Sequence, residues 1–283
     1  MKAGHHGGSA SRVGIVVLLV ALAVFASSSG RAETVAYWVY GDSGTLTDLV
    51  GDDQTLTNGS NVVDSPTTVA HNPVPNPDPA TGKAPVRPTV STQTATRMIK
   101  EAQGSGLPVT ADVAVHQLHL TEMDVDGFVA ECHVSPPFRT LADRDALRRA
   151  VAEGTISAIC SDHQPHEPDA KQRPFPETEP GISGLETLLG LTLRLVEEQV
   201  LDLPTALARV TSGPADILGL PYGRLGIGSP ADVCVFDPNR DWTLDLDKMH
   251  SEGRNTPFAG WDFPARVTHT LFNGRVVYRA TDA

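Results

Sequence analysis

From residue 91 onward the hydrophobic and polar positions follow regular periods, and they predict an α/β protein. Segment 94–103 places its apolar side chains on one face, as an amphipathic helix does. Segments 108–115 and 156–160 are short apolar runs typical of buried strands, and 140–153 between them predicts another helix. Strand, helix and strand within about 50 residues predict that the two strands are parallel.

The remaining pattern predicts more helices and then a β-rich end. Leucine spacing predicts a helix over 184–199, followed by shorter helices over 203–210 and 213–219. Beyond residue 220 the segments expected to form strands are 231–237, 242–244, 267–272 and 275–278. Asn273-Gly274, between the last two of them, is a strong hairpin signal.

The first 90 residues have a different character. Segment 13–26 is continuously apolar, too short to span a membrane and followed by small residues, which predicts a signal peptide or uncleaved anchor over 1–32. Residues 33–90 are rich in Thr, Asn, Asp, Gly and Pro, and predict a disordered linker. We therefore expect an irregular N-terminal third, an α/β part over 91–220 and a small β domain over 221–283.

Composition narrows the possible functions. With 40% hydrophobic residues, most of the 283-residue chain can bury a core. The formal net charge of −12 argues against nucleic acid or an anionic membrane surface as a partner. The chain has three cysteines, an odd number in apolar contexts, so we expect small buried thiols of a reduced compartment rather than disulfides.

Candidate chemistry gathers just after the predicted strand 156–160. Asp162 follows this strand, and His163 and His166 come next in a polar loop. The C-terminal ends of buried parallel strands carry the chemistry of α/β barrels, and an ionised Asp can bind a metal or accept a proton. Alternatively, Asp162 caps the next element and both histidines are solvated. The spacing favours the functional interpretation.

Eight stretches of this chain resemble class I dihydroorotases, of the metal-dependent amidohydrolase superfamily, over the C-terminal half only. They are residues 106–113, 135–139, 154–156, 161–166, 171–175, 181–186, 228–232 and 254–260. Allantoinases and hydantoinases share the fold but fit the Asp-His-Gln-Pro-His loop less well. The resemblance thus favours a dihydroorotase over these relatives.

The resemblance implies a fold and an activity. The fold is the last two or so βα units of a (β/α)8 TIM-type barrel, followed by a small β domain. The activity is zinc-dependent interconversion of dihydroorotate and N-carbamoyl-aspartate, a small-molecule reaction of pyrimidine biosynthesis. Such enzymes are cytoplasmic, which conflicts with the secreted or membrane-anchored location suggested by segment 13–26.

The resemblance also assigns residues. Asp162 matches the family's last metal ligand, which is also the catalytic general base. His166 matches a histidine that contacts the substrate ring, and Pro180 and Gly181 match a loop whose backbone contacts the substrate. Ser135 stands where typical members carry a substrate-binding Asn, which weakens that assignment.

Other family motifs have no counterpart in this sequence. Missing are the His-x-His pair, the Arg after it, the bridging carboxylate or lysine, and two histidines of the middle strands; Thr89 stands near the place of the last of these. A catalytic zinc takes about three protein ligands, so we expect the chain as written, a truncated or fused member, to be inactive. His116 and His119 could be recruited as ligands, but we favour them as polar residues at a barrel rim.

Two other roles remain open. Some dihydroorotase-like proteins lack metal ligands and act as non-catalytic scaffolds for aspartate carbamoyltransferase. Open strand edges would also favour pairing with a partner or self-association. A secreted or anchored remnant without inherited function is the third possibility.

Overall fold

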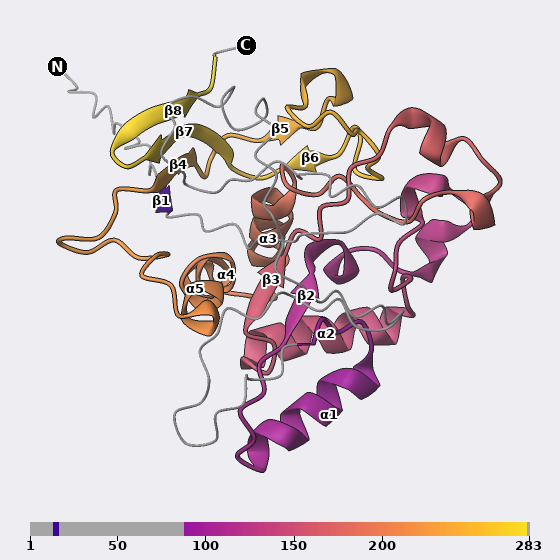
Figure 1. Cartoon of the computed structure of the whole chain (residues 1–283), viewed down its shortest axis with the longest axis horizontal. Helices are drawn as coiled ribbons and strands as arrows, with labels where there is room; N and C mark the ends of the chain where they lie inside the picture. Colours follow the sequence, from indigo (N-terminus) through magenta and orange to yellow (C-terminus); the bar gives the residue numbers. More distant parts are fainter. Residues whose placement is uncertain (1–13, 17–87, 282–283) are drawn as a thin grey trace, which may run out of the picture.

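The computed structural model describes residues 14–16 and 88–281 (Figure 1). The predicted signal-like segment and linker therefore lie almost entirely outside the described residues. Of the apolar segment, only Gly14–Val16 is described, and it forms strand β1. This strand pairs antiparallel with β4 (Val233–Asp237), near the other end of the chain.

The α/β part confirms the predicted order of elements. It contains α1 (Gln93–Gly104), β2 (Asp112–Ala114), α2 (Leu141–Glu153), β3 (Ala158–Cys160), α3 (Leu188–Glu197), α4 (Leu203–Val210) and α5 (Ser212–Leu218). Strands β2 and β3 pair in parallel, as predicted. Isolated parallel bridges join Thr89 to Asp112 and His163 to Ile182 on either side of this pair.

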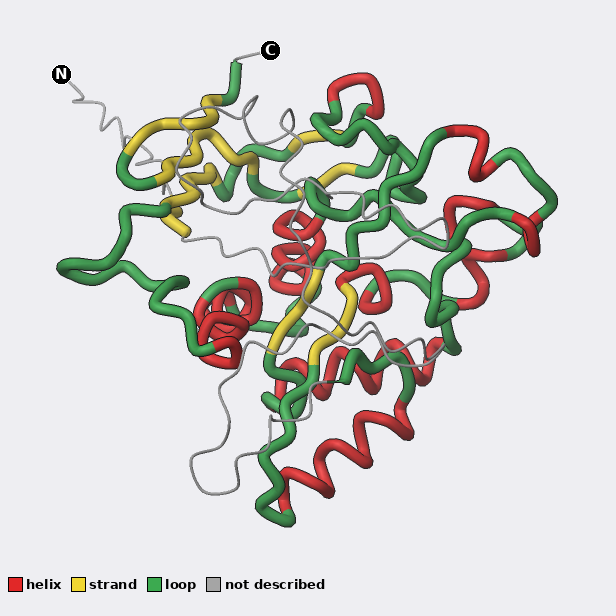
Figure 2. Tube along the Cα trace, viewed as in Figure 1, coloured by secondary structure: helices red, strands yellow, loops and turns green. Residues whose placement is uncertain are grey.

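Both strands are shorter than predicted. The apolar run 108–115 loses its first residues because Pro108 is exposed outside the sheet, and its end because Val115 begins the 3-10 helix η2 (Val115–Leu118). Further 3-10 helices are η3 (Glu122–Val125), η4 (Ala130–Cys132), η5 (Pro168–Lys171), η6 (Phe175–Glu177) and η7 (Leu246–Lys248). Figure 2 shows that loops and such short turns make up much of the chain between the regular elements.

Local signals explain the helix boundaries. Thr140 and Asp143 form a capping box at the start of α2, and Gly154 ends it with φ of 87°. Helix α3 starts at Leu188 instead of the predicted residue 184. In the turn before it, the Gly184 and Leu185 amides donate to the His163 ring.

The β-rich end forms an antiparallel sheet in the order β1-β4-β7-β8, beside a small β5–β6 pair. The other strands are β5 (Trp242–Thr243), β6 (Asp262–Phe263), β7 (Arg266–Phe272) and β8 (Arg275–Arg279). Asn273 and Gly274 both have positive φ, so the predicted hairpin is confirmed. In Figure 1 this sheet lies at one end of the molecule, apart from β2 and β3.

One main core joins the two regions. Leu118, Leu191 and Leu195 from the α/β part are fully buried in the same cluster as Phe258 and Phe263 from beyond residue 220. The division near residue 220 therefore stays a prediction. Within the part of the chain that the structure describes, no helix is both long and apolar enough to cross a membrane.

The cysteines agree in part with expectation. All three are free thiols, and Cys132 and Cys234 are buried. Cys160 is only partly buried, and its Sγ lies 3.7 Å from an Asp112 carboxylate oxygen. It is thus part of a polar group beside the candidate site rather than a simple apolar side chain.

Candidate functional site

Asp162 lies two residues beyond β3, where the chain turns out of the sheet. Its φ of 44° is in the left-handed region, which Asp tolerates better than most residues. Gln164 donates a hydrogen bond of 2.9 Å from Nε2 to Oδ1 of Asp162. The Asp162 side chain keeps 13% of its surface exposed, so the carboxylate is held in place yet accessible.

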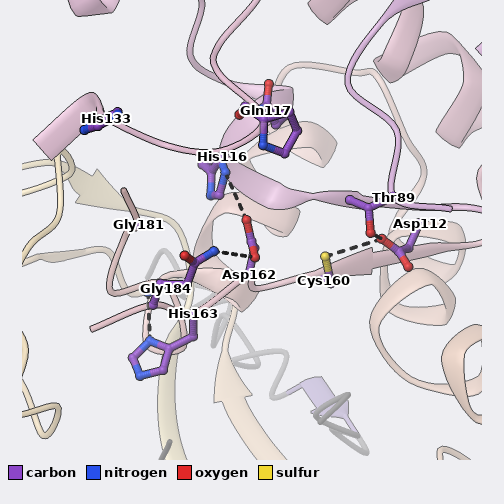
Figure 3. A network of polar contacts seen from close by, with 12 residues as sticks. Thr89, Asp112, His116, Gln117, His133, Cys160, Asp162, His163, Gly181 and Gly184 are labelled. Carbon is purple, nitrogen blue, oxygen red and sulfur yellow. Dashed lines mark hydrogen bonds and ion pairs between the residues drawn. The ribbon is translucent and has the colours of Figure 1, made fainter. Parts of the chain in front are cut away.

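His116 faces this carboxylate from η2. Figure 3 shows the two side chains directed toward each other, with Nε2 3.8 Å from Oδ2 of Asp162. That distance exceeds a hydrogen bond. The ring packs edge-on against Phe138, and its Nδ1 has no hydrogen-bond partner. Burial lowers the pKa of His116 more than Asp162 raises it, so the ring is neutral near pH 7.

Both His116 and His119 are buried, and their place at a barrel rim stays a prediction. His119 donates from Nε2 to the Leu191 carbonyl at 2.9 Å, so this nitrogen is engaged in the core. Burial, and then the Arg148 charge, lower its pKa to about 3. Of the two histidines, only His116 therefore reaches Asp162.

His163 is also buried, which excludes the solvated-loop alternative for this residue. Its Nδ1 accepts hydrogen bonds from the backbone N–H groups of Gly184 and Leu185, at 3.0 and 3.3 Å. Burial lowers its pKa to about 4. The ring thus shapes the turn before α3 and points away from Asp162 (Figure 3).

Three of the residues that the resemblance assigns to substrate binding lie together. His166 donates from Nε2 to the Pro180 carbonyl at 3.0 Å, and Gly181 follows directly. The Gly181 amide donates to the His133 carbonyl at 2.8 Å. Ser135 is exposed and joined to Pro136 by a cis peptide bond, and the contacts among the other three do not include it.

Gly181→Ala should destabilise the protein by about 2 kcal/mol. The φ angle of Gly181 is 144°, which residues with a side chain rarely adopt. An added Cβ would also lie 2.5 Å from Cβ of Gln164. Urea unfolding measures the loss. The matched control is Gly104→Ala, where a Cβ meets no atom within 4 Å. Equal stability of the two variants would contradict the close packing of these loops.

Lys171 begins one of the stretches that carry the resemblance, but the sequence assigns it no role. Its buried ammonium group donates to the carbonyls of Ala130, His133 and Glu179, at 3.1, 3.4 and 2.7 Å. Burial lowers its pKa to about 8. Lys171 therefore connects the chain before Pro180 to the loop around η4. The spacing of apolar residues along the sequence does not predict such a contact.

The donors near Asp162 do not complete a metal site. Within residues 14–16 and 88–281, no group of three or more His, Cys, Asp or Glu side chains could hold a metal ion. Asp162 and His116 are ligand types that zinc takes, but about three are needed. Thr89, near the place of a family histidine, instead donates to Asp112 at 2.6 Å.

Comparison with known proteins shows the family of this chain. The model of the amidohydrolase family matches residues 91–277. The chain belongs to the amidohydrolase family. The matched range contains all eight stretches that carry the resemblance to dihydroorotases, and the prediction of a C-terminal-half match is confirmed.

Curated relatives of this amidohydrolase-family chain carry dihydroorotase names. A dihydroorotase-like protein of Pseudomonas aeruginosa is 52% identical over 181 residues, 64% of this chain and 43% of that protein. A dihydroorotase of Syntrophotalea carbinolica is 47% identical over 193 residues, 68% of this chain and 45% of that protein. The chain thus spans less than half the length of these relatives.

Solved structures agree on the fold. The dihydropyrimidinase of Brevibacillus agri has a TM-score of 0.65 at 25% identity, covering 70% of this chain and 45% of that one. The inactive dihydroorotase-like domain of a Chaetomium thermophilum CAD-like multifunctional protein has a TM-score of 0.52 at 22% identity, covering 68% and 50%. At 22% identity, the second likeness concerns the fold alone.

Proposed function

We propose that this chain carries the Asp162 side of a dihydroorotase-type site, which hydrolyses a cyclic amide. The observation that supports this most is the Asp162 carboxylate at the end of β3, bonded to Gln164 and facing His116. His166, Pro180 and Gly181, the proposed substrate contacts, are joined to one another beside it. The 47% identity to a protein named dihydroorotase points to dihydroorotate as the substrate.

We further propose that β2, β3 and the flanking parallel bridges belong to a (β/α)8 barrel, with a small β domain after residue 220. In such barrels, the C-terminal ends of the strands carry the catalytic side chains, and Asp162 has this position. A role in pyrimidine biosynthesis in the cytoplasm, with zinc as the metal, follows from the same proposal.

Asp162 has a defined task in this reaction. Hydrolysis adds water to the ring carbonyl carbon, breaks the carbon–nitrogen bond and leaves a carboxylate and an amide nitrogen that gains a proton. A carboxylate at this position can accept the proton from water and return it to the nitrogen. His166, Pro180 and Gly181 would hold the ring while this transfer takes place.

The purified 283-residue chain should not hydrolyse dihydroorotate, even with added zinc. The reason is that a catalytic zinc takes about three protein ligands, whereas the described residues bring only His116 to Asp162 and contain no group of three. A chromatographic assay for N-carbamoyl-aspartate, with and without added zinc, checks this prediction. Turnover above the rate of a heat-denatured sample would contradict it.

A chimera tests the proposed function directly. The 193-residue matched segment of the Syntrophotalea carbinolica dihydroorotase is replaced by the matching residues of this chain. We expect the folded chimera to hydrolyse dihydroorotate, because the proposed contacts come from this chain and the other ligands from the relative. A folded but inactive chimera would overturn the hydrolase proposal.

A non-catalytic scaffold for aspartate carbamoyltransferase is the second candidate. It is favoured by the incomplete donor set among the described residues and by the name dihydroorotase-like of the 52% identical relative. Light scattering of this chain mixed with the transferase measures the complex. A stable complex together with an inactive chimera would favour the scaffold over the hydrolase.

A further inference from the structure

Asn255 connects two loops of the candidate site with its side-chain amide. Its Oδ1 accepts a hydrogen bond of 2.7 Å from the His166 backbone N–H. Its Nδ2 donates to the carbonyls of Gln164 and Gly181, at 2.9 and 3.0 Å. Asn255 is buried, and so is its bond to Gly181, while the other two bonds are partly buried.

The residue type suits this position. An asparagine amide offers one acceptor and two donors, which matches one N–H and two carbonyl groups. An ionised aspartate would turn an acceptor toward two carbonyl oxygens, and an alanine would leave all three backbone groups unpaired. The contact therefore depends on the amide group and not only on the volume of the side chain.

The backbone around Asn255 is fixed against the same loops. The Asn255 carbonyl accepts from the Ser183 amide at 2.9 Å. A Cβ at Gly253 would lie 2.4 Å from Cβ of Pro165, so this segment packs directly on the loop that follows Asp162. Two amides at residues 250–251 donate to the Glu186 carboxylate. The segment is thus a fixed support for the Asn255 side chain.

Gln164 carries this support to the carboxylate. Its carbonyl accepts from Asn255, while its side chain donates to Asp162. We propose that Asn255 is a positioning residue, which fixes the substrate-binding backbone at His166 and Gly181 relative to Asp162. This positioning role rests on the proposed function. The three hydrogen bonds by which Asn255 joins the loops at 164–166 and 180–183, here called the clamp, do not depend on it.

Hydrogen exchange of the full chain tests the clamp. N255A should accelerate exchange at least about tenfold at the amides within 164–166 and 180–183, because all three hydrogen bonds of the side chain are lost, and leave α4 unchanged. N239A, at an exposed asparagine, is the matched control and should change neither loop. N255S removes the amide but keeps a hydroxyl that can donate or accept, so it replaces N255A if that variant yields no folded protein. Unchanged loops, or equal acceleration throughout the chain, would overturn the clamp.

Kinetics of the chimera test the positioning role. N255A should raise KM for dihydroorotate about tenfold and change kcat less than about threefold, because substrate contacts are displaced while Asp162 is kept. An unchanged KM would overturn the positioning role. A chimera that is inactive even with Asn255 intact would refute the proposed function and, with it, the positioning role, while the exchange experiment would still decide the clamp.

Discussion

Asp162→Asn should reduce dihydroorotate hydrolysis by the chimera about 1,000-fold. The amide has nearly the same shape and keeps an oxygen that can accept the Gln164 hydrogen bond. It removes the negative charge and cannot take a proton from water. General acid–base groups contribute about 10²–10⁴-fold to enzymatic rates, and the substitution removes such a group.

The control is Asp241→Asn, which makes the same chemical change at an exposed position. Its kcat should stay within about twofold of the unsubstituted chimera. The zinc content of both variants is measured by inductively coupled plasma mass spectrometry. It distinguishes loss of the metal from loss of the Asp162 carboxylate as general base. A fall in kcat of less than about tenfold in D162N, with zinc content unchanged, would show that Asp162 is not the catalytic carboxylate.

Local signals made much of the fold predictable. Helix α2 begins at Thr140 and ends at Gly154 because its capping box and left-handed glycine are set by neighbouring residues. The hairpin between β7 and β8 was predictable for the same reason, because Asn273-Gly274 sets its turn. The parallel pairing of β2 and β3 followed from the alternation of strands and helices.

The errors in the fold come from contacts between distant segments. The leucine pattern favours a helix from residue 184, but α3 begins at Leu188, and the Gly184 and Leu185 amides before it donate to the distant His163 ring. The apolar pattern also extends β2 beyond Ala114, where the chain instead coils into η2. The spacing of apolar residues along the chain carries no information about hydrogen bonds to residues distant in the sequence.

Some residues of the candidate site were likewise predictable from local sequence, and others were not. Asp162 was predictable because a carboxylate directly after a buried strand is a local pattern. The burial of His116 was not, since it depends on packing against Phe138 and on the position of Asp162. The role of Asn255 depends on partners 74 to 91 residues away in the sequence, so only the structure brings it to the site.

Acid should destabilise the protein through His119, by about 3 kcal/mol between pH 7.5 and pH 4.5. Burial lowers the folded-state pKa of His119 to about 3, while an unfolded histidine titrates near its ordinary value of 6.5. As pH falls below 6.5, the unfolded state binds a proton that the folded state does not. The stabilisation is therefore fully present above pH 6.5 and is lost progressively toward pH 3, at about 1.4 kcal/mol per pH unit.

Urea unfolding at the two pH values measures this effect, and His119→Gln isolates it from other acid-sensitive groups. The Gln amide nitrogen can replace Nε2 as donor to the Leu191 carbonyl, and it does not titrate. The variant should thus lose about 3 kcal/mol less than the wild type on acidification. His250→Gln, at an exposed histidine, should behave like the wild type. If His119→Gln lost as much stability as the wild type, the buried ring would titrate in the folded protein, and its contact with Leu191 would not hold it neutral.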